Sequence, residues 1–141
     1  MNAILYTTEI LRLSTALPQP RALERVDGSA ELRSPTCGST VRADVQIGEE
    51  GRIEDVSFIV HACAFGQASA SLVAREARGL TLEDVAQATT EISNWLEGRR
   101  ADPGSMPGLE ALTPARAKRA RHAAILLPFR ALASAMLSRN G

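Results

Sequence analysis

The chain has little of what several protein classes require. Only two cysteines and five aromatic residues occur among its 141 residues, so neither a disulfide-stabilised scaffold nor an aromatic base-stacking platform is expected. No apolar run approaches the roughly 18 residues of a membrane-spanning helix. No basic segment precedes the N-terminal apolar stretch, so we expect no signal peptide and a cytoplasmic location. A Gly-rich phosphate loop and the GxSxG and HExxH motifs are also missing. Since no acid–base or nucleophile–base pair is evident, an enzyme with its own turnover is not expected.

Acidic residues are missing from the C-terminal part of the chain. All 16 acidic residues lie at or before Glu110, whereas six of the 16 basic residues follow it. Residues 1–110 therefore carry a net charge of −6, and the remainder carries +6. A basic tail favours a nucleic acid or an acidic protein partner, with a solvated helix face as the alternative. The acidic body would oppose nonspecific phosphate binding, so nucleic acid is the less favoured partner.

The hydrophobic patterning indicates one α+β domain over residues 1–141. Apolar side chains alternate with polar ones from Val41 to Ile47 and again around Val56–Val60, with a short turn between them. So short a turn permits only an antiparallel hairpin. A weaker edge strand is expected within 21–34. Strands come first and helices later, which predicts a small antiparallel three-stranded sheet with helices packed on one face.

Helical patterns occupy most of the rest. A helix is expected over 2–14, and Ala- and Ser-rich residues from Cys63 to Arg78 predict a helix that packs closely on its neighbours. Thr81 with Asp84 resembles a capping box at the start of a short helix, and Thr89 or Thr90 is expected to start another. The last helix is predicted from about Pro114 to Arg139, with a kink at Pro128.

The two cysteines flank the predicted hairpin. Cys37 precedes its first strand and Cys63 follows its second, so an antiparallel pair brings both to one end of the sheet. Cys63 also precedes a helix, whose positive dipole end favours a thiolate. Two thiolates at one rim supply half of a tetrahedral zinc or iron–sulfur site. The alternative is two inert, buried thiols.

The two histidines are candidates to extend such a site. His61 lies two residues before Cys63, so both side chains share one face of an extended strand. His122 lies near the start of the last helix. Either could act as a metal ligand, and an ordinary core or surface histidine is the alternative for each.

The segments around the cysteines resemble the NifU/IscU-type iron–sulfur cluster scaffold family. The resemblance rests on Pro35-Thr36-Cys37-Gly38, the hairpin, and the stretch from Cys63 to Ser71, which is most similar to the SUF-type branch. It implies a small antiparallel sheet with helices on one side. It also implies acceptance of sulfur from a cysteine desulfurase and a [2Fe–2S] cluster, or zinc, bound by three cysteines and an aspartate. Cys37 and Cys63 match the first two cysteines.

The chain departs from the family pattern at two ligand positions. Ser39 occupies the position of the aspartate and Ala124 that of the third cysteine. Cys37, Cys63 and His122 or His61 could form a mixed site, or two monomers could pool four thiolates in a homodimer. The sequence thus favours a divergent scaffold that binds a cluster or metal through Cys37 and Cys63, or assists assembly. The alternative is an interaction module that docks onto a cysteine desulfurase or another assembly protein without holding a cluster.

Overall fold

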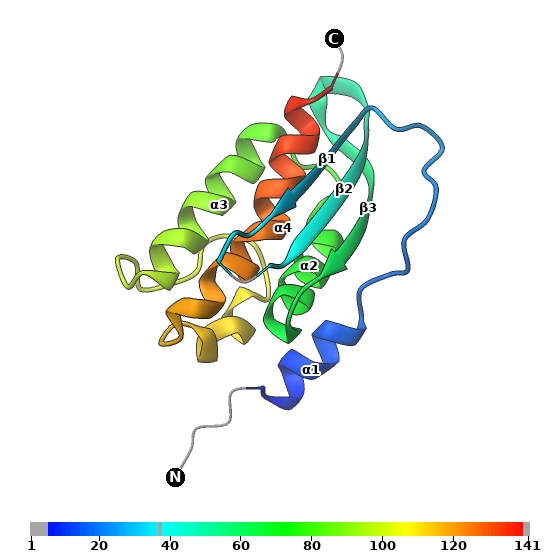
Figure 1. The fold of residues 1–141 in the computed structure, drawn as a ribbon. Coiled ribbons are helices and arrows are strands. Elements are labelled where there is room, and N and C mark those ends of the chain that lie inside the picture. The colour runs from blue at the N-terminus through cyan, green and yellow to red at the C-terminus, as the bar shows by residue number, and fades with distance from the viewer. Residues whose placement is uncertain (1–5, 37, 140–141) are drawn as a thin grey trace.

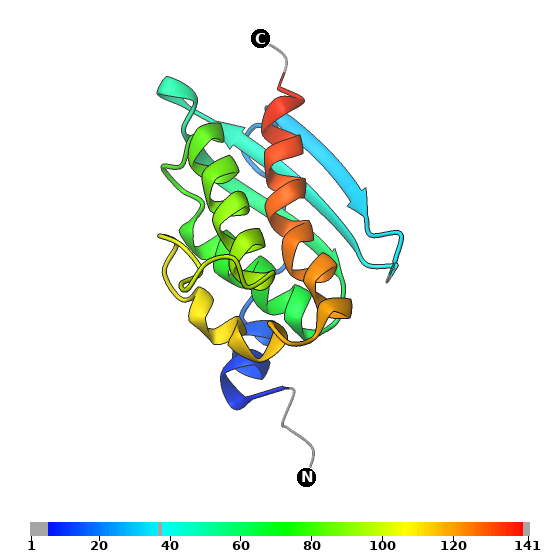
Figure 2. The same cartoon turned by 90° about the vertical axis from the view of Figure 1, so that its left-hand side faces the viewer.

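A three-stranded antiparallel sheet forms one layer of the molecule. The computed structural model describes residues 6–36 and 38–139. Strands β1 (Gly28–Arg33), β2 (Thr40–Ile47) and β3 (Ile53–His61) lie in the order β1-β2-β3. The helices cover one face of this sheet (Figures 1 and 2). The predicted α+β architecture is therefore confirmed.

The β2–β3 hairpin follows the alternation in the sequence. Val41, Ala43 and Val45 are fully buried on the helix side, as expected for a strand with one face on the core. Thr40 pairs with His61 at one end of the hairpin. The turn at the other end holds a short 3-10 helix, η1 (Glu49–Gly51), in which Glu50 and Gly51 both have positive φ.

Two helices form the layer on the sheet. Helices α2 (Ala64–Glu76) and α4 (Arg119–Leu137) cross it side by side (Figure 2). Their approach is close at Gly66, where an added Cβ would lie 3.3 Å from the carbonyl oxygen of Ala124. The buried hydroxyl of Ser69 donates a hydrogen bond to the carbonyl oxygen of Ile125 at 2.6 Å. Small residues thus allow the close packing that the sequence predicted.

Helix α3 (Leu82–Leu96) corrects one prediction. Thr81 caps it, and the reciprocal hydrogen bonds with Asp84 confirm the capping box. The sequence predicted a second helix starting at Thr89 or Thr90, but a single helix continues through both residues. The Thr89 hydroxyl donates to the Val85 carbonyl oxygen at 2.7 Å, so it is satisfied within the helix rather than as a cap.

The C-terminal helical region begins differently from the prediction. A 3-10 helix, η2 (Leu109–Ala115), includes Pro114, and α4 starts only at Arg119. Lys118 separates the two helices because its backbone is not helical, with φ −115° and ψ 81°. Helix α4 continues through Pro128.

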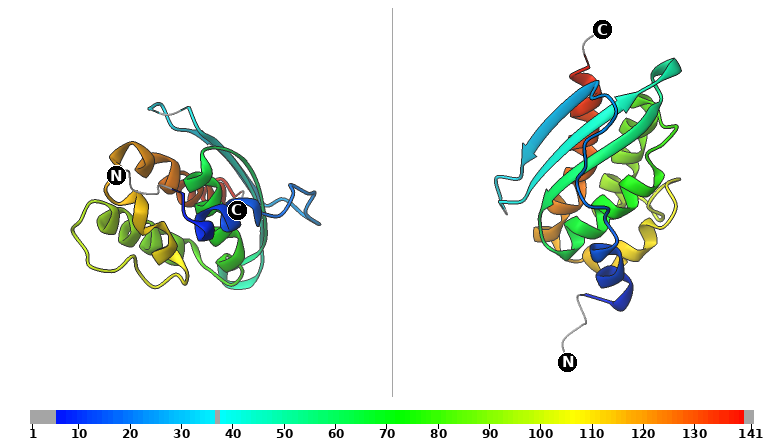
Figure 3. Two further views of the ribbon diagram at one scale, coloured as in Figure 1. Left: turned by 90° about the horizontal axis from the view of Figure 1, so that it is seen from below. Right: turned by 90° about the vertical axis from the view of Figure 1, so that its right-hand side faces the viewer.

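The N-terminal part of the described chain wraps around the sheet edge. Helix α1 (Thr8–Thr15) packs against α2, and residues 16–27 then run over the outer face of the sheet to reach β1 (Figure 3, right). The Arg21 amide donates to the Ser57 hydroxyl at 3.1 Å, which fixes this segment on β3. No helix within 6–36 and 38–139 combines the length and the apolar character that crossing a membrane requires.

Candidate functional site

A cavity of about 200 Å³ lies at the end of the sheet where β2 begins and β3 ends. Three parts of the chain meet there: the start of β2, the turn from β3 into α2, and the first turns of α4. The residues that line it are Gly38, Ser39, His61, Ala62, Cys63, Ala120, Arg121 and Ala124. The antiparallel pairing of Thr40 with His61 brings the first two parts together, as the sequence predicted for this rim.

Cys63 is the thiol placed at this cavity. It is the N-cap residue of α2, with extended backbone dihedrals of φ −67° and ψ 174°. Its carbonyl oxygen accepts the amide of Gln67, while its side chain makes no capping hydrogen bond. The half-buried sulfur is a free thiol beside the positive end of the α2 dipole. The thiol is thus placed where a group in the cavity can reach it.

Cys37 lies outside the described residues, and the loop around it is anchored on both sides. The Gly38 amide donates to the Ser34 carbonyl oxygen at 2.9 Å, and the Ser34 amide donates to the Ser39 carbonyl oxygen at 2.8 Å. Gly38 has φ 72°, a conformation that favours glycine, and it lines the cavity. Gly38, the residue that follows Cys37 in the sequence, therefore lines the cavity.

The two positions that depart from the family pattern both line the cavity. Ser39 is 6% exposed and Ala124 is 2% exposed. Ser39 enters from the start of β2 and Ala124 from α4, so they approach from different elements. Residues at these two positions face the same space as Cys63. The methyl group of Ala124 cannot bind a metal, and the Ser39 hydroxyl replaces a carboxylate with a neutral group.

The two histidines occupy different places. His61 is exposed at the end of β3 and lines the cavity with Cys63. His122 does not line it. The His122 Nε2 atom lies 3.0 Å from the carbonyl oxygen of Ala115 and 3.1 Å from that of Arg116, so this nitrogen carries the proton. These contacts hold the imidazole ring against the end of η2. The role of His122 as a metal ligand stays a prediction, and the geometry of the cavity does not support it.

The basic groups near the start of α4 divide between two roles. The Arg121 side chain lines the cavity. Arg116 instead stacks 5.0 Å from the centroid of the Trp95 ring, and its Nε donates to the Trp95 carbonyl oxygen at 3.0 Å. Arg121 was not among the candidate ligands named from the sequence. Its spacing of three residues from Ala124 was the available signal, since side chains at i and i+3 share a helix face.

The donor set at the cavity is small. Of the described residues that line it, Cys63 and His61 are the soft or borderline ligands, and none carries a carboxylate. Among residues 6–36 and 38–139, no three His, Cys, Asp or Glu side chains are grouped closely enough to hold a metal ion. A tetrahedral site here would therefore require Cys37 together with a further ligand from water, sulfide or a second chain.

Comparison with protein families identifies the domain. A family model described as "NifU-like N terminal domain" matches residues 5–125. The chain belongs to the NifU-like N-terminal domain family. The match includes both cysteines, Ser39 and Ala124, and it confirms the resemblance to NifU/IscU-type proteins.

Curated relatives of this NifU-like chain are iron–sulfur assembly proteins. The chain is similar to "Iron-sulfur cluster assembly scaffold protein IscU" of Escherichia coli strain K12, with 36% identity over 72 residues. That match covers 50% of this chain and 56% of the relative. IscU of Azotobacter vinelandii is 32% identical over 71 residues, covering 46% of this chain and 56% of that protein. The chain thus spans somewhat more than half the length of these relatives, whose names lend no support to the zinc alternative.

Solved structures share the fold over nearly the full length. The N-terminal part of a NifU-like protein from Brucella abortus superposes with a TM-score of 0.87 at 30% identity, covering 95% of this chain and 93% of that one. An iron–sulfur cluster assembly scaffold protein of the SUF system from Fervidobacterium islandicum gives a TM-score of 0.83, covering 94% and 96%. Its identity is 22%, so it shows the shared fold alone. The predicted closeness to the SUF-type branch stays a prediction.

Proposed function

We propose that this NifU-like protein takes part in iron–sulfur cluster assembly as a divergent scaffold, with iron or a cluster as its cargo. The observation that carries the proposal is the position of Cys63 at the N-terminus of α2, on a cavity that Ser39 and Ala124 also line. Cys37, one residue before the cavity-lining Gly38, is the second expected ligand. A cysteine desulfurase is the expected sulfur donor, and the protein is not expected to turn over a substrate of its own.

The incomplete donor set predicts weak or shared binding of the cargo. A cluster bound by two thiolates lacks half of the usual protein ligands. His61 offers an imidazole on the same cavity. A homodimer that pools the Cys37 and Cys63 thiolates of two copies would instead supply four sulfur ligands. The mixed site would give a cluster that passes readily to a recipient, because few protein bonds hold it.

Anaerobic reconstitution with ferrous iron and sulfide tests this proposal. The wild-type protein should gain visible absorption from a cluster and lose it in Cys63→Ser and Cys37→Ser. His61→Asn should reduce the occupancy, whereas the matched variant His122→Asn should not, because His122 faces η2. Size-exclusion chromatography of the loaded protein separates the mixed site from the dimer. Equal iron content in wild type and both cysteine variants would contradict the proposal.

Restoring the family ligands provides a second test. The double variant Ser39→Asp with Ala124→Cys adds a carboxylate and a thiol to the cavity that Cys63 lines. We expect higher cluster occupancy and slower loss of the cluster to a chelator than in wild type. Unchanged occupancy would show that the cavity does not act as the cluster site.

A second candidate function is a docking module that holds no cluster. The lining of the cavity favours it, because the positions of two family ligands carry Ser39 and Ala124 while Arg121 adds a positive charge. This module would bind a desulfurase or another assembly protein through the basic start of α4. A pull-down from the host with wild type and Arg121→Glu tests it. A partner that is retained by Cys63→Ser and lost with Arg121→Glu would favour docking over cluster binding.

A further inference from the structure

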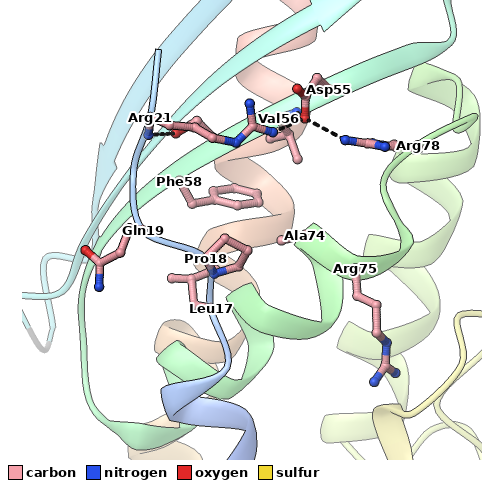
Figure 4. Close-up of a pocket in the computed structure, with 11 residues that line it drawn as sticks. Leu17, Pro18, Gln19, Arg21, Asp55, Val56, Phe58, Ala74, Arg75 and Arg78 are labelled. Carbon is pink, nitrogen blue, oxygen red and sulfur yellow. Dashed lines mark hydrogen bonds and ion pairs between the residues drawn. The ribbon is translucent and has the colours of Figure 1, made fainter. Parts of the chain in front are cut away.

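A second cavity of about 270 Å³ lies away from the cysteine end. It is bounded by the segment 17–21 that follows α1, by β3 around Phe58, and by the C-terminal half of α2 with the residues just after it (Figure 4). It shares no lining residue with the cavity at Cys63. Nothing in the proposed scaffold function uses it.

Three arginines line this cavity together with one carboxylate. Asp55 accepts from Arg21 at 2.6 Å and from Arg78 at 3.4 Å, so the two guanidinium groups share one partner at the rim. Figure 4 shows both side chains directed at Asp55. Arg75 pairs with Glu76 at 3.1 Å, and Glu76 does not line the cavity. The Arg75 guanidinium points away from Asp55, and its Nη2 donates to the Pro107 carbonyl oxygen at 3.5 Å. At Asp55 two guanidinium groups therefore meet one carboxylate, which leaves one positive charge in excess.

The inner wall of the cavity is apolar. The carbon surface beside Arg21 and Arg78 comes from Leu17, Pro18, Val56, Phe58 and Ala74. Such a surface accepts the apolar part of a ligand whose charged group binds at the rim.

The free edge of β3 adds backbone polar groups to this wall. The Val56 amide bonds to the side chain of its own neighbour Asp55, and the Val60 carbonyl oxygen accepts from Gln67 of α2. Both groups point away from β2, and backbone groups alternate in direction along a strand. The Phe58 amide and carbonyl therefore also face the open edge, beside the cavity.

We propose that this cavity binds a compact organic anion, with a carboxylate or phosphate on Arg21 and Arg78 and an apolar body against Leu17, Pro18 and Phe58. Guanidinium groups bind both oxyanions bidentately. The volume is near the lower end of the range for small-molecule sites, so a ligand of one ring or a short chain fits. The same chemistry is offered by a free metabolite and by the C-terminal carboxylate of a protein chain that ends in an apolar residue.

Amide shifts in ¹H–¹⁵N NMR spectra test this proposal with defined probes. The probes are phenyl phosphate, 3-phenylpropanoate, and the peptide acetyl-Gly-Gly-Phe with a free carboxylate. The neutral controls are 3-phenylpropanamide and the same peptide as its C-terminal amide. We expect the anionic probes to shift the amides of Phe58, Ala74 and Arg78, and the neutral controls to bind at least about fivefold more weakly. Tighter binding of the peptide acid than of 3-phenylpropanoate identifies a chain terminus as the source, and the reverse identifies a small molecule.

A matched pair of arginine variants gives the second readout. The Arg78 side chain is 71% exposed and lies 3.4 Å from Asp55, while the Arg99 side chain is 72% exposed and lies 3.3 Å from Glu97. Arg78→Gln should weaken the tightest probe about fivefold, and Arg99→Gln should leave its affinity unchanged. Since both side chains are exposed, neither change threatens folding. Equal shifts by charged and neutral probes, no shift at the three amides with any anionic probe, or equal losses in the two variants would each overturn the proposal.

Discussion

The two ends of α4 differ in how closely the protein packs around them. Near its C-terminal end, the carbonyl oxygen of Ala135 lies so close to Gly28 of β1 that a Cβ at residue 28 would overlap it. The Ser138 hydroxyl there joins both the amide and the carbonyl oxygen of Ser29, each at 3.0 Å. Near its N-terminal end, Ala120, Arg121 and Ala124 border a cavity of about 200 Å³.

The C-terminal part of α4 thus stabilises the fold by packing on β1, whereas its N-terminal part forms one wall of a candidate site. Where α4 meets β1, the backbone itself makes the contact, so side-chain volume is tightly restricted. At the cavity, α4 contributes lining residues, so its side chains there help to set the chemistry of the site. The family fold is therefore retained although Ala124, on this part of α4, departs from the pattern that the resemblance implies.

The largest expected effect tests the closely packed end. Gly28→Ala should lower the free energy of unfolding by about 3 kcal/mol, because the new Cβ forces β1 away from α4. Gly98→Ala is the matched control, since open space surrounds that residue and only its positive φ of 80° is strained. Its loss should be about 1 kcal/mol in the same urea titration. A Gly28→Ala variant no less stable than Gly98→Ala would break the comparison.

The next effect concerns the contact between α2 and α4 in the middle of the helix. Ser69→Ala removes the buried hydrogen bond to the Ile125 carbonyl oxygen and should cost about 1.5 kcal/mol of unfolding free energy. Ser14→Ala removes a similar bond to the Leu11 carbonyl oxygen at the surface of α1, and should change stability by less than about 0.5 kcal/mol. If Ser69→Ala and Ser14→Ala lost the same unfolding free energy in thermal or urea denaturation, burial would not determine the cost of losing such a hydrogen bond.

A pH-dependent effect is expected away from both ends of α4. The hydrogen bond from Arg21 holds the pKa of Asp55 below its ordinary value, despite partial burial. A lowered folded-state pKa stabilises the protein above the unfolded-state pKa, and this stabilisation disappears as the pH falls through the folded-state value. Asp55→Asn should therefore cost about 1 kcal/mol near neutral pH, a figure kept small by the exposure of Arg21, and progressively less below about pH 4. A cost that does not change with pH would contradict this origin.

The smallest expected effect tests the open end. Ala124→Cys should change the unfolding free energy by less than about 0.5 kcal/mol, because the added sulfur enters the cavity. Ala135→Cys adds the same atom at a fully buried position and should cost more than about 1 kcal/mol. Equal destabilisation by the two changes would remove the distinction between the ends.

Local patterns in the sequence predicted the sheet and the cysteine rim. The alternation from Val41 to Ile47 and the short turn sufficed to predict an antiparallel hairpin with Cys63 at its end, and the observed pairing of Thr40 with His61 agrees with it. The helix boundaries were harder to predict from the sequence. The Thr89 hydroxyl bonds to the Val85 carbonyl oxygen instead of capping a new helix, and the backbone of Lys118 is not helical. The position of His122 against η2 likewise depends on how two helical segments meet.

The arginine-lined cavity had no sequence signature. Arg21, Asp55 and Arg78 are far apart in the chain and converge only because residues 16–27 wrap around the edge of β3. Arg121 at the cysteine cavity differs, since its helical spacing from Ala124 was visible in the sequence. Long-range convergence, rather than local pattern, therefore limits what can be predicted about the sites of this protein.

The contact between Ser29 and Ser138 has a consequence for how the chain folds during synthesis. The two residues are 109 positions apart, so β1 can reach its final place on α4 only after almost the whole chain has left the ribosome. The β2–β3 hairpin and α2 are made earlier and need no such partner to begin forming. The first strand of the sheet is thus among the last elements to be secured, and until then its open side can pair with other chains.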